Sequence, residues 1–324
     1  MTAGASIELA ERLLGRSFSV ERPITVDQTN FSVVVDDAVV VKWLRPPVPV
    51  PHPGVELIRH LAAAGFDQMP ALVGADERDG VVHAIVTAYL PGAVDGWDWY
   101  VDDVEAWLAG TLPFDSLTSS AQRMGSITAS MHRALEDLQP ALADLAEVAE
   151  RGMADLRLAT GRLEGLEWLD ESVVATALQP LRDASRRMPA HRIHGDLHAG
   201  QFLRAGTVMQ VTDFDGNPLQ DATGRAQSQS PLRDVASMLQ SIAHVGSIVL
   251  KRRRPDRNID IDRFIVEATR AALDAYAAMD DVDQQLLLGF RVAQELHEYA
   301  YSIQHLPHWR YVADDALPRL LGSC

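Results

Sequence analysis

The chain has a single cysteine, Cys324, at its last position, so a disulfide within the chain is impossible. It also lacks an apolar run of about 18 residues, the length that a membrane-spanning helix needs. Residues 1–16 have neither a basic head nor an apolar centre, which argues against a secretory signal. Together these absences predict a protein of a reducing compartment, and we expect it in the cytoplasm, with no membrane partner.

Basic residues are scarce relative to acidic ones. Lys and Arg number 29 against 45 Asp and Glu, which gives a formal net charge of −16 over 324 residues. A chain this acidic repels a phosphate backbone, so we expect no nucleic-acid partner. A nucleotide can bind in such a field where Mg²⁺ offsets the charge locally, and a neutral or cationic co-substrate is favoured. The oligomeric state stays open, and a monomer is one option.

A glycine-rich phosphate loop is also missing. Residues 27–32, ahead of the first strong β-pattern, contain no glycine. Backbone amides and the hydroxyls of Thr29 and Ser32 are the groups there that could cover the phosphates of a nucleotide. The sequence therefore gives no independent signal for a nucleotide at this point of the chain.

Apolar patterns divide the chain into a β-rich and a helical part. In the first part we expect strands at 32–35, 39–44 and 81–88, a proline-rich connector at 46–53 and a helix at 55–61. In the second part, apolar spacing of i, i+3, i+4 predicts helices at 120–135, 141–163, 173–188, 232–249, 261–278 and 284–303, with a short strand at 208–213. This pattern predicts an α+β fold with a small β-rich N-terminal lobe, 1–90, and a large, mostly helical C-terminal lobe, 91–324.

The region around residue 196 contains the groups that phosphoryl transfer needs, in the order that kinases use. The motif HGDLH at 194–198 is followed by Gln201 and then by TDFD at 212–215. Protein kinases use H-R-D-x-x-x-x-N and then D-F-G to place a catalytic base and the metal ligands. The same spacing makes Asp196 the candidate catalytic residue, and Gln201 and Asp213 the candidate Mg²⁺ ligands.

Lys42 lies late in the expected strand 39–44, inside an otherwise apolar run. In kinases a lysine on such a strand contacts the α- and β-phosphates, and a glutamate on the following helix holds it. Glu56 is at the start of the next expected helix. A solvated edge-strand lysine and a glutamate that complements a helix N-terminus are the plainer alternatives. With the downstream motif, both residues are candidates for ATP binding.

The glycine at position 195, where protein kinases carry arginine, resembles the aminoglycoside phosphotransferase and choline kinase superfamily. The resemblance implies a bilobal protein-kinase-like fold with ATP between the lobes. The small lobe, 1–90, would bind the nucleotide, and the large lobe, 91–324, would carry the catalytic loop and the sugar-binding helices. The superfamily often lacks a glycine-rich loop. It also implies a hinge ahead of Pro91 and Gly92, where Thr87, Tyr89 and Leu90 would bind adenine. A plain strand-ending turn is the alternative. Structural roles are implied for His194, which would hold the catalytic loop, and for Asp234, which would cap backbone amides beneath it.

Several blocks resemble bacterial maltokinases, namely 89–97, 194–201, 230–236 and the stretch from Glu298 to Trp309. The small lobe is shorter than in maltokinases. Gln294 occupies the place of a lysine on their substrate helix. The stretch 213–218, with Gln294 and the pair at 297–298, is more similar to the glucosamine kinases of actinobacteria. An amino-sugar site favours the loss of a cation, because a buried lysine would repel an ammonium group.

Three polar residues near the C-terminus, Gln294, Glu298 and Tyr301, are spaced i, i+4, i+7 and so share one helix face. A mixture of aromatic, amide and carboxylate groups is typical of a sugar site, and an exposed polar stripe is the alternative. Asp215 contacts either the metal or the substrate. The expected substrate-binding set is Asp196, His198, Asp215, Gln294, His297, Glu298, Tyr301 and Trp309.

The resemblance implies an enzyme that uses ATP and Mg²⁺ to phosphorylate an alcohol group of a small amino sugar, turning glucosamine into glucosamine 6-phosphate. The alternatives left open are a maltokinase that forms maltose 1-phosphate, an aminoglycoside phosphotransferase and a choline-type kinase. A catalytically dead nucleotide-binding module is a further alternative. The intact Lys42, Glu56, Asp196 and Asp213 argue against that last one.

Overall fold

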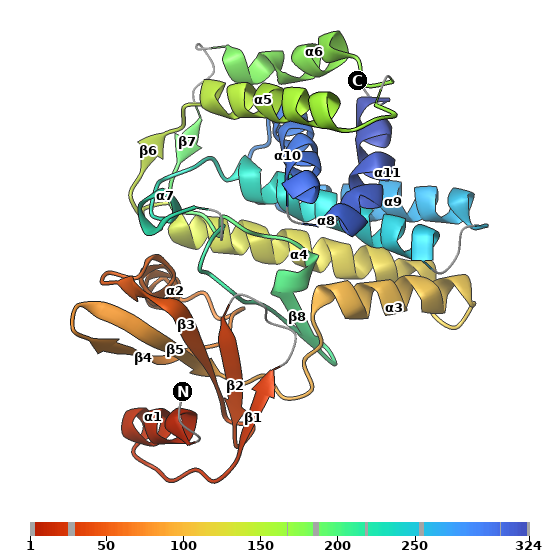
Figure 1. Ribbon diagram of the computed structural model, residues 1–324. Coiled ribbons are helices and arrows are strands. Elements are labelled where there is room, and N and C mark those ends of the chain that lie inside the picture. Colours follow the sequence, from red (N-terminus) through yellow and green to blue (C-terminus); the bar gives the residue numbers. More distant parts are fainter. Residues whose placement is uncertain are drawn as a thin grey trace. The chain divides into compact units, whose positions relative to one another are not determined.

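Figure 1 shows a computed structural model of the chain, which describes residues 4–24, 30–166, 168–183, 188–217, 220–252, 256–304 and 306–322. The chain forms two compact units. Unit 1 consists of Met1–Asp95, His194–Asp196 and Gln201–Gln227, and unit 2 of Gly96–Ile193, Leu197–Gly200 and Ser228–Cys324. The expected division at residue 90 into a nucleotide lobe and a sugar lobe stays a prediction.

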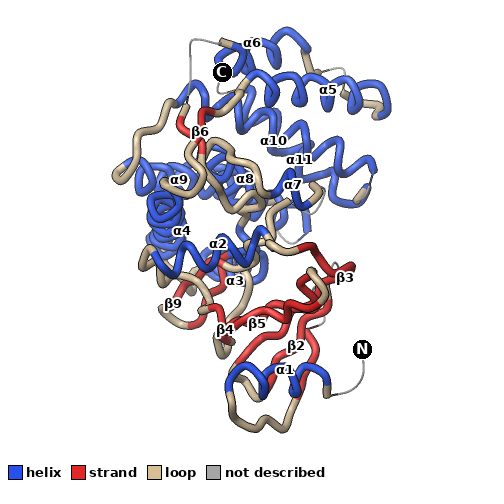
Figure 2. Tube along the Cα trace, turned by 90° about the vertical axis from the view of Figure 1, so that its left-hand side faces the viewer, coloured by secondary structure: helices blue, strands red, loops and turns tan. Residues whose placement is uncertain are grey.

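Unit 1 is built on one antiparallel sheet of five strands, in the order β1-β2-β3-β5-β4. These strands are drawn in red in Figure 2. Their bounds are β1 (Glu21–Ile24), β2 (Phe31–Val35), β3 (Val39–Pro49), β4 (Leu72–Arg78) and β5 (Val81–Ala88). The strands expected at 32–35 and 39–44 are present and form the β2–β3 hairpin, whose turn places Asp36 and Asp37 at φ 47° and 50°. Aspartate is one of the few side chains that tolerate this left-handed region.

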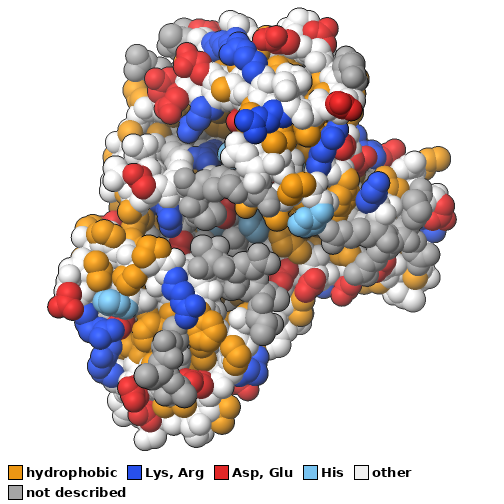
Figure 3. Space-filling model, in the orientation of Figure 1, with side chains coloured by type: hydrophobic (Ala, Val, Ile, Leu, Met, Phe, Trp, Pro, Cys, Tyr) orange, Lys and Arg blue, Asp and Glu red, His pale blue; other side chains and the backbone are white. Residues whose placement is uncertain are grey.

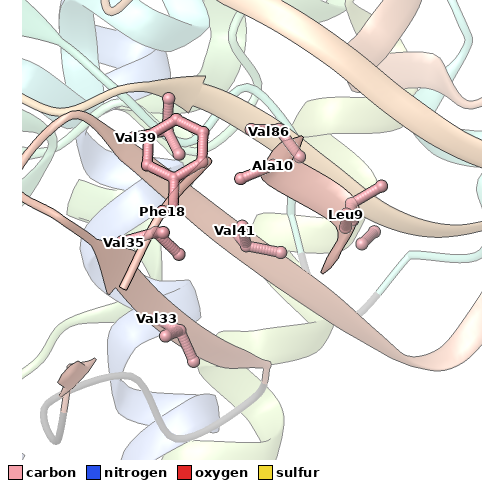
Figure 4. Packing of buried hydrophobic residues seen from close by; sticks show 9 residues of the cluster. Leu9, Ala10, Phe18, Val33, Val35, Val39, Val41 and Val86 are labelled. Carbon is pink, nitrogen blue, oxygen red and sulfur yellow. The ribbon is translucent and has the colours of Figure 1, made fainter. Parts of the chain in front are cut away.

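Helix α1 (Ala5–Leu14) contributes to the apolar core of the sheet. Figure 4 shows Leu9 and Ala10 of α1 near Val41 and Val86 of the strands. The cluster is rich in β-branched residues, which suit a pleated surface, and consists of Leu9, Ala10, Phe18, Val33, Val35, Val39, Val41, Ala84 and Val86. This packing fixes the strand that carries Lys42.

The expected connector at 46–53 is wrong over its first half, because β3 continues to Pro49. Its later part pairs with β5 at Val48 and Pro49 after a shift of register. A proline is tolerated in a sheet at such an irregularity, because no backbone N–H is required there for hydrogen bonding between strands. Helix α2 (Pro53–Ala63) then begins with proline in its first turn, where the missing N–H costs nothing.

The later segments of unit 1 carry the TDFD motif. They contain the hairpin of β8 (Phe202–Ala205) and β9 (Val208–Val211) and the short helix α7 (Ala222–Arg225). The expected strand 208–213 ends early, at Val211. Thr29 and Pro218, which belong to expectations made from the sequence, lie outside the described residues.

Unit 2 is mostly helical (Figure 1). Two of the helices expected there are shorter than the sequence predicts. The helix expected at 141–163 begins at Ala146, because residues 141–142 pair instead with 189–190, and the helix expected at 173–188 ends at Arg182. Its elements are α3 (Gly96–Leu108), α4 (Phe114–Leu135), β6 (Ala141–Leu142), α5 (Ala146–Arg162), α6 (Glu171–Arg182), β7 (Pro189–Ala190), α8 (Leu232–Arg252), α9 (Asn258–Ala277), α10 (Gln284–Gln304), η2 (Pro307–Trp309) and α11 (Arg310–Leu321).

Charged side chains of both signs are mixed over the described surface in Figure 3. On this face the acidic residues are therefore spread out and do not form a single acidic patch. Within the described ranges, no helix is both long and apolar enough to cross a bilayer.

Candidate active site

Lys42 of β3 lies between two carboxylates of unit 1. Its Nζ is 2.6 Å from Asp213 Oδ1 and 2.9 Å from Asp215 Oδ2. The side chains of Lys42 and Asp215 are 18% and 15% exposed, whereas that of Asp213 is 41% exposed. Burial by itself lowers the pKa of Lys42, but the negative charges of Asp215 and Asp213 outweigh it and raise the pKa above its ordinary value. Lys42 is therefore a fixed positive charge beside the TDFD motif.

Asp213 follows β9 in an unusual backbone conformation. Its φ is 61°, in the left-handed region that residues other than glycine rarely adopt. This conformation follows two residues after the end of β9 at Val211. Non-glycine residues held in this region cluster at functional sites, where the surrounding structure determines them.

His194 connects the HGD segment to the end of β9. Its Nε2 lies 2.9 Å from the carbonyl oxygen of Thr212, and its Nδ1 lies 3.4 Å from the backbone nitrogen of Asp196. Because a carbonyl can only accept, Nε2 carries the proton and Nδ1 accepts from the Asp196 N–H. The ring is buried, and its centroid is 5.1 Å from that of Phe214. His194 thereby holds the backbone of Asp196 to the segment that carries Asp213.

The two other motif residues of unit 1 differ in exposure. Asp196 is half-buried, while Gln201 is 8% exposed and accepts a backbone hydrogen bond from Thr212 at 2.9 Å through its carbonyl oxygen. Gly195 has a φ of 82°, a conformation that suits glycine and strains any other residue. The backbone at this position therefore accounts for the glycine in HGD.

The expected nucleotide residues lie in unit 1 as well. Glu56 is in the first turn of α2, and Thr87 is near the end of β5. The backbone N–H of Tyr89 donates to Ala38 at 2.9 Å, and the carbonyl of Leu90 accepts from Ala93 at 3.2 Å. These two hydrogen bonds fix the backbone of residues 89–93. An adenine-binding role for the segment, and a contact between Lys42 and Glu56, stay predictions.

In unit 2, aromatic rings gather around His198. Trp97 of α3 stacks on it with ring centroids 5.5 Å apart and planes at 24°, and Trp309 of η2 meets Trp97 edge-on at 6.2 Å. A Cβ at Gly200 would lie 2.6 Å from the Trp97 ring, so only glycine leaves room for the indole. Trp97 is not among the site residues expected from the sequence. Its position in one of the maltokinase-like blocks is the signal that could have identified it.

The polar residues Gln294, His297, Glu298 and Tyr301 are carried by α10, and each is half-buried. His297 Nδ1 is 3.4 Å from Asp155 Oδ2 of α5. These four residues are therefore neither core residues nor freely solvated ones. Their role in binding a sugar stays a prediction.

A buried ion pair joins α10 to α8. His244 Nε2 lies 3.2 Å from Oε1 and 3.4 Å from Oε2 of Glu295, and both side chains are buried. Burial alone lowers the pKa of His244, but the charge of Glu295, with smaller contributions from Glu298 and Asp315, raises it above its ordinary value. The pair fixes α10 against α8 next to the residues expected to bind the sugar.

Asp234, in the first turn of α8, is also buried. Its Oδ2 is 3.2 Å from His132 Nε2 of α4, and His132 Nδ1 is 2.9 Å from the hydroxyl of Tyr276 of α9. This contact ties three helices of unit 2 together and supports a structural role for Asp234. That role stays a prediction.

The donor set suits Mg²⁺. Among the described residues, no three His, Cys, Asp or Glu side chains form a ready cage for a metal ion. Mg²⁺ is usually held by one or two carboxylates together with water and substrate phosphates, and it prefers oxygen ligands. The carboxylate of Asp213, which is the more exposed of the two beside Lys42, and the amide oxygen of Gln201 offer such ligands.

Comparisons with known proteins agree closely with one another. The chain is 40% identical to a glucosamine kinase of Streptacidiphilus jiangxiensis, over 93% of this chain and 73% of that protein. It is 37% identical to a glucosamine kinase of Mycolicibacterium smegmatis, over 94% of this chain and 80% of that protein. No family model matches the chain.

Solved structures give the same result. A glucosamine kinase in complex with glucosamine, ADP and inorganic phosphate is 35% identical, with a TM-score of 0.84 over 98% of this chain and 83% of that one. A choline/ethanolamine kinase family protein from Mesorhizobium loti, 15% identical with a TM-score of 0.57 over 94% of this chain and 87% of that one, shares the fold alone. The expected α+β, protein-kinase-like fold is confirmed.

Proposed function

Because the chain belongs to the glucosamine kinase family, we propose that it transfers the γ-phosphoryl group of ATP to glucosamine, forming glucosamine 6-phosphate and ADP. The observation that carries this proposal is the group formed by Lys42 with Asp213 and Asp215. It places one fixed cation beside two carboxylates, as phosphate and metal binding require. We further propose that the protein acts in the cytoplasm, where ATP is available.

On the nucleotide side, Lys42 would bind the α- and β-phosphates, and Asp213 with Gln201 would hold Mg²⁺. The metal would neutralise charge that develops on the phosphate oxygens. Lys42 already shares its ammonium group between two carboxylates, so phosphate oxygens can replace the more exposed one, Asp213. The partly buried Asp215 would keep Lys42 in place during this exchange.

On the acceptor side, Asp196 would orient the hydroxyl of the sugar and accept its proton as the phosphoryl group arrives. The hydrogen bond from its backbone N–H to His194 supports this role, since it ties the carboxylate's own backbone to the segment that carries Asp213. A base that is held in this way needs little reorganisation to reach its reactive geometry.

Recognition of the amine would fall to Glu298. The other candidate carboxylate, Asp215, is already neutralised by Lys42 at 2.9 Å, which leaves less attraction for an ammonium group. Gln294 adds no positive charge to the same helix face. The rings of Trp97, His198 and Trp309 would supply the apolar surface on which a sugar face stacks.

A steady-state comparison of glucosamine, glucose, N-acetylglucosamine and maltose with ATP tests the proposal. A carboxylate that meets an ammonium group contributes about 1.5–3 kcal/mol, so we expect kcat/KM for glucosamine to exceed that for glucose roughly 10- to 150-fold. N-acetylglucosamine should be poor, because acetylation removes the charge and adds bulk. Equal rates with glucose would refute recognition of the amine, and maltose as the best acceptor would replace the proposal with a maltokinase. Kanamycin and choline, run in the same series, test the remaining kinase alternatives.

A further inference from the structure

Helix α2 begins against the segment that carries Asp215. A Cβ built on Gly54 would lie 2.8 Å from the carbonyl oxygen of Phe214 and 2.9 Å from Oδ1 of Asp215. Real Cβ atoms essentially never come so close to another heavy atom, and one of these two neighbours is backbone. The first turn of α2 and the TDFD segment are therefore in direct contact, and a side chain at residue 54 would separate them.

The carboxylate of Asp215 is confined from two sides as a result. Its Oδ1 faces the backbone of Gly54, while its Oδ2 lies 2.9 Å from Lys42 Nζ. Only 15% of the side chain is exposed. On the main-chain side, Arg225 of α7 approaches the carbonyl oxygen of Asp215 at 3.5 Å. The position of Asp215 beside Lys42 thus depends on where α2 begins.

His52 determines that starting point. Its Nδ1 accepts hydrogen bonds from the backbone N–H groups of Gly54 at 3.1 Å and Val55 at 3.3 Å, as an N-cap does. Burial lowers the pKa of His52, so the ring is neutral and its Nδ1 is able to accept. The usual alternative, an aspartate cap, would place a negative charge near Asp215 and compete for Lys42. A neutral cap avoids this.

We infer that His52 and Gly54 are positioning residues for phosphoryl transfer, and that the capped first turn of α2 holds Asp215 against Lys42. The expected effect on kcat rests on the proposed function, whereas the close approach of Gly54 to Phe214 and Asp215 is a feature of the structure. Neither residue is expected to touch substrate. Both act through Asp215, and through it on the lysine that would bind the phosphates.

The first test replaces Gly54 with alanine. Alanine favours a helix more than glycine does, so any loss must come from the added methyl group at this contact. We expect Gly54→Ala to lower kcat at least about tenfold, a change of about 1.4 kcal/mol in the barrier, with the KM for glucosamine nearly unchanged. Gly161→Ala is the matched control, because Gly161 is also helical and a Cβ there meets nothing within 4 Å. It should leave kcat at the wild-type value. A folded Gly54→Ala protein with wild-type kcat overturns the inference.

The second test separates positioning from simple helix capping. His52→Asn keeps a neutral acceptor at the cap and should retain most of the wild-type kcat, whereas His52→Ala removes the acceptor and should lose it. If His52→Ala lowers the melting temperature but leaves kcat at the wild-type value, His52 only stabilises the helix and the inference is wrong.

A crystal structure of Gly54→Ala gives a readout that does not depend on activity. We expect the carboxylate of Asp215 to move out of hydrogen-bond range of Lys42 Nζ, and an unchanged pair overturns the inference. Should the wild-type protein fail to phosphorylate glucosamine, the proposed function fails, while this structure still decides the positioning role.

Discussion

His244 and Glu295 form an ion pair in which both side chains are buried, with His244 Nε2 within 3.4 Å of both carboxylate oxygens. The two residues come from α8 and α10, so the pair fixes the rotation of α10 about its own axis. Gln294 and Glu298 are neighbours of Glu295 on the same helix. The direction in which those candidate sugar contacts point is therefore linked to a pair that itself touches no substrate.

Breaking this pair should destabilise the protein strongly. Glu295→Ala leaves a buried imidazole without its carboxylate, and removing one partner of a buried pair costs about 3–5 kcal/mol. The double variant His244→Gln with Glu295→Gln keeps a hydrogen bond and removes both charges, so it should recover much of that loss. Urea unfolding of the three proteins measures the difference. A loss under about 1 kcal/mol, the value of an exposed pair, would contradict the assignment.

The same pair should make stability depend on pH in a defined direction. The pKa of His244 is raised in the folded protein, against about 6.5 in the unfolded chain. The folded state therefore binds the proton more tightly, so the stabilisation is complete below about pH 6.5 and is lost as the pH rises through the raised folded-state pKa. We expect the difference in free energy of unfolding between wild type and His244→Gln to shrink from pH 6 to pH 9. A difference that grows from pH 6 to pH 9 would contradict a raised pKa of His244 in the folded protein.

Asp196→Asn should lower kcat about 100-fold or more, because general-base catalysis contributes about 10²–10⁴-fold and the amide cannot accept the proton. Binding of ADP should be nearly unchanged, since the carboxylate acts on the acceptor and not on the nucleotide. Turnover numbers and calorimetric titration with ADP check the two halves of this expectation. A variant that keeps more than about a tenth of wild-type turnover excludes Asp196 as the catalytic residue.

Asp213→Ala should abolish Mg²⁺-dependent activity, whereas Gln201→Asn should keep part of it. Asp213 would supply a charged ligand, and asparagine offers the same amide oxygen as glutamine on a shorter arm. The measurement is initial rate against Mg²⁺ concentration for each variant. Asp213→Asn serves as the control for shape, because it keeps the size of the side chain and removes its charge. An identical Mg²⁺ dependence in Asp213→Ala and wild type rejects the metal assignment.

Glu298→Gln should raise the KM for glucosamine much more than the KM for ATP. A charge-assisted hydrogen bond to the ammonium group is worth about 1.5–3 kcal/mol, and the amide keeps only part of it. Glu147→Gln is the matched control on α5, where the side chain is 66% exposed. If Glu298→Gln and Glu147→Gln behave alike, the polar face of α10 is a solvated stripe and not a sugar site.

The α+β class of the fold could be predicted from the sequence, because apolar residues recur with different periods in strands and in helices. The spacing of the HGD and TDFD motifs made Asp196, Gln201 and Asp213 the candidate site residues, and their roles stay predictions. The local sequence shows Lys42 only as a lysine on an expected strand. Its contact with Asp213, 171 residues away, was not predicted, because the kinase pattern pairs the strand lysine with a glutamate such as Glu56.

Other features depend on contacts that no local pattern encodes. The extension of β3 to Pro49 is stabilised by pairing of Val48 and Pro49 with β5, which overrides the low strand propensity of proline. His52 gave no signal as a cap, because histidine is not among the usual capping residues. Trp97 acquires its role only when it stacks on His198, which comes about a hundred positions later in the chain.

The discontinuous make-up of unit 1 limits how this protein can be cut or recombined. A fragment of residues 1–95 would contain the five-stranded sheet and Lys42, but it would lack both acidic partners of that lysine, which arrive with Gln201–Gln227. In such a fragment the ammonium group of Lys42 would lack the two counter-charges that hold it in the complete unit. Exchange of this unit between relatives must therefore transfer three separate stretches of the gene at once, and an expression library of contiguous fragments should yield no stable half-molecule.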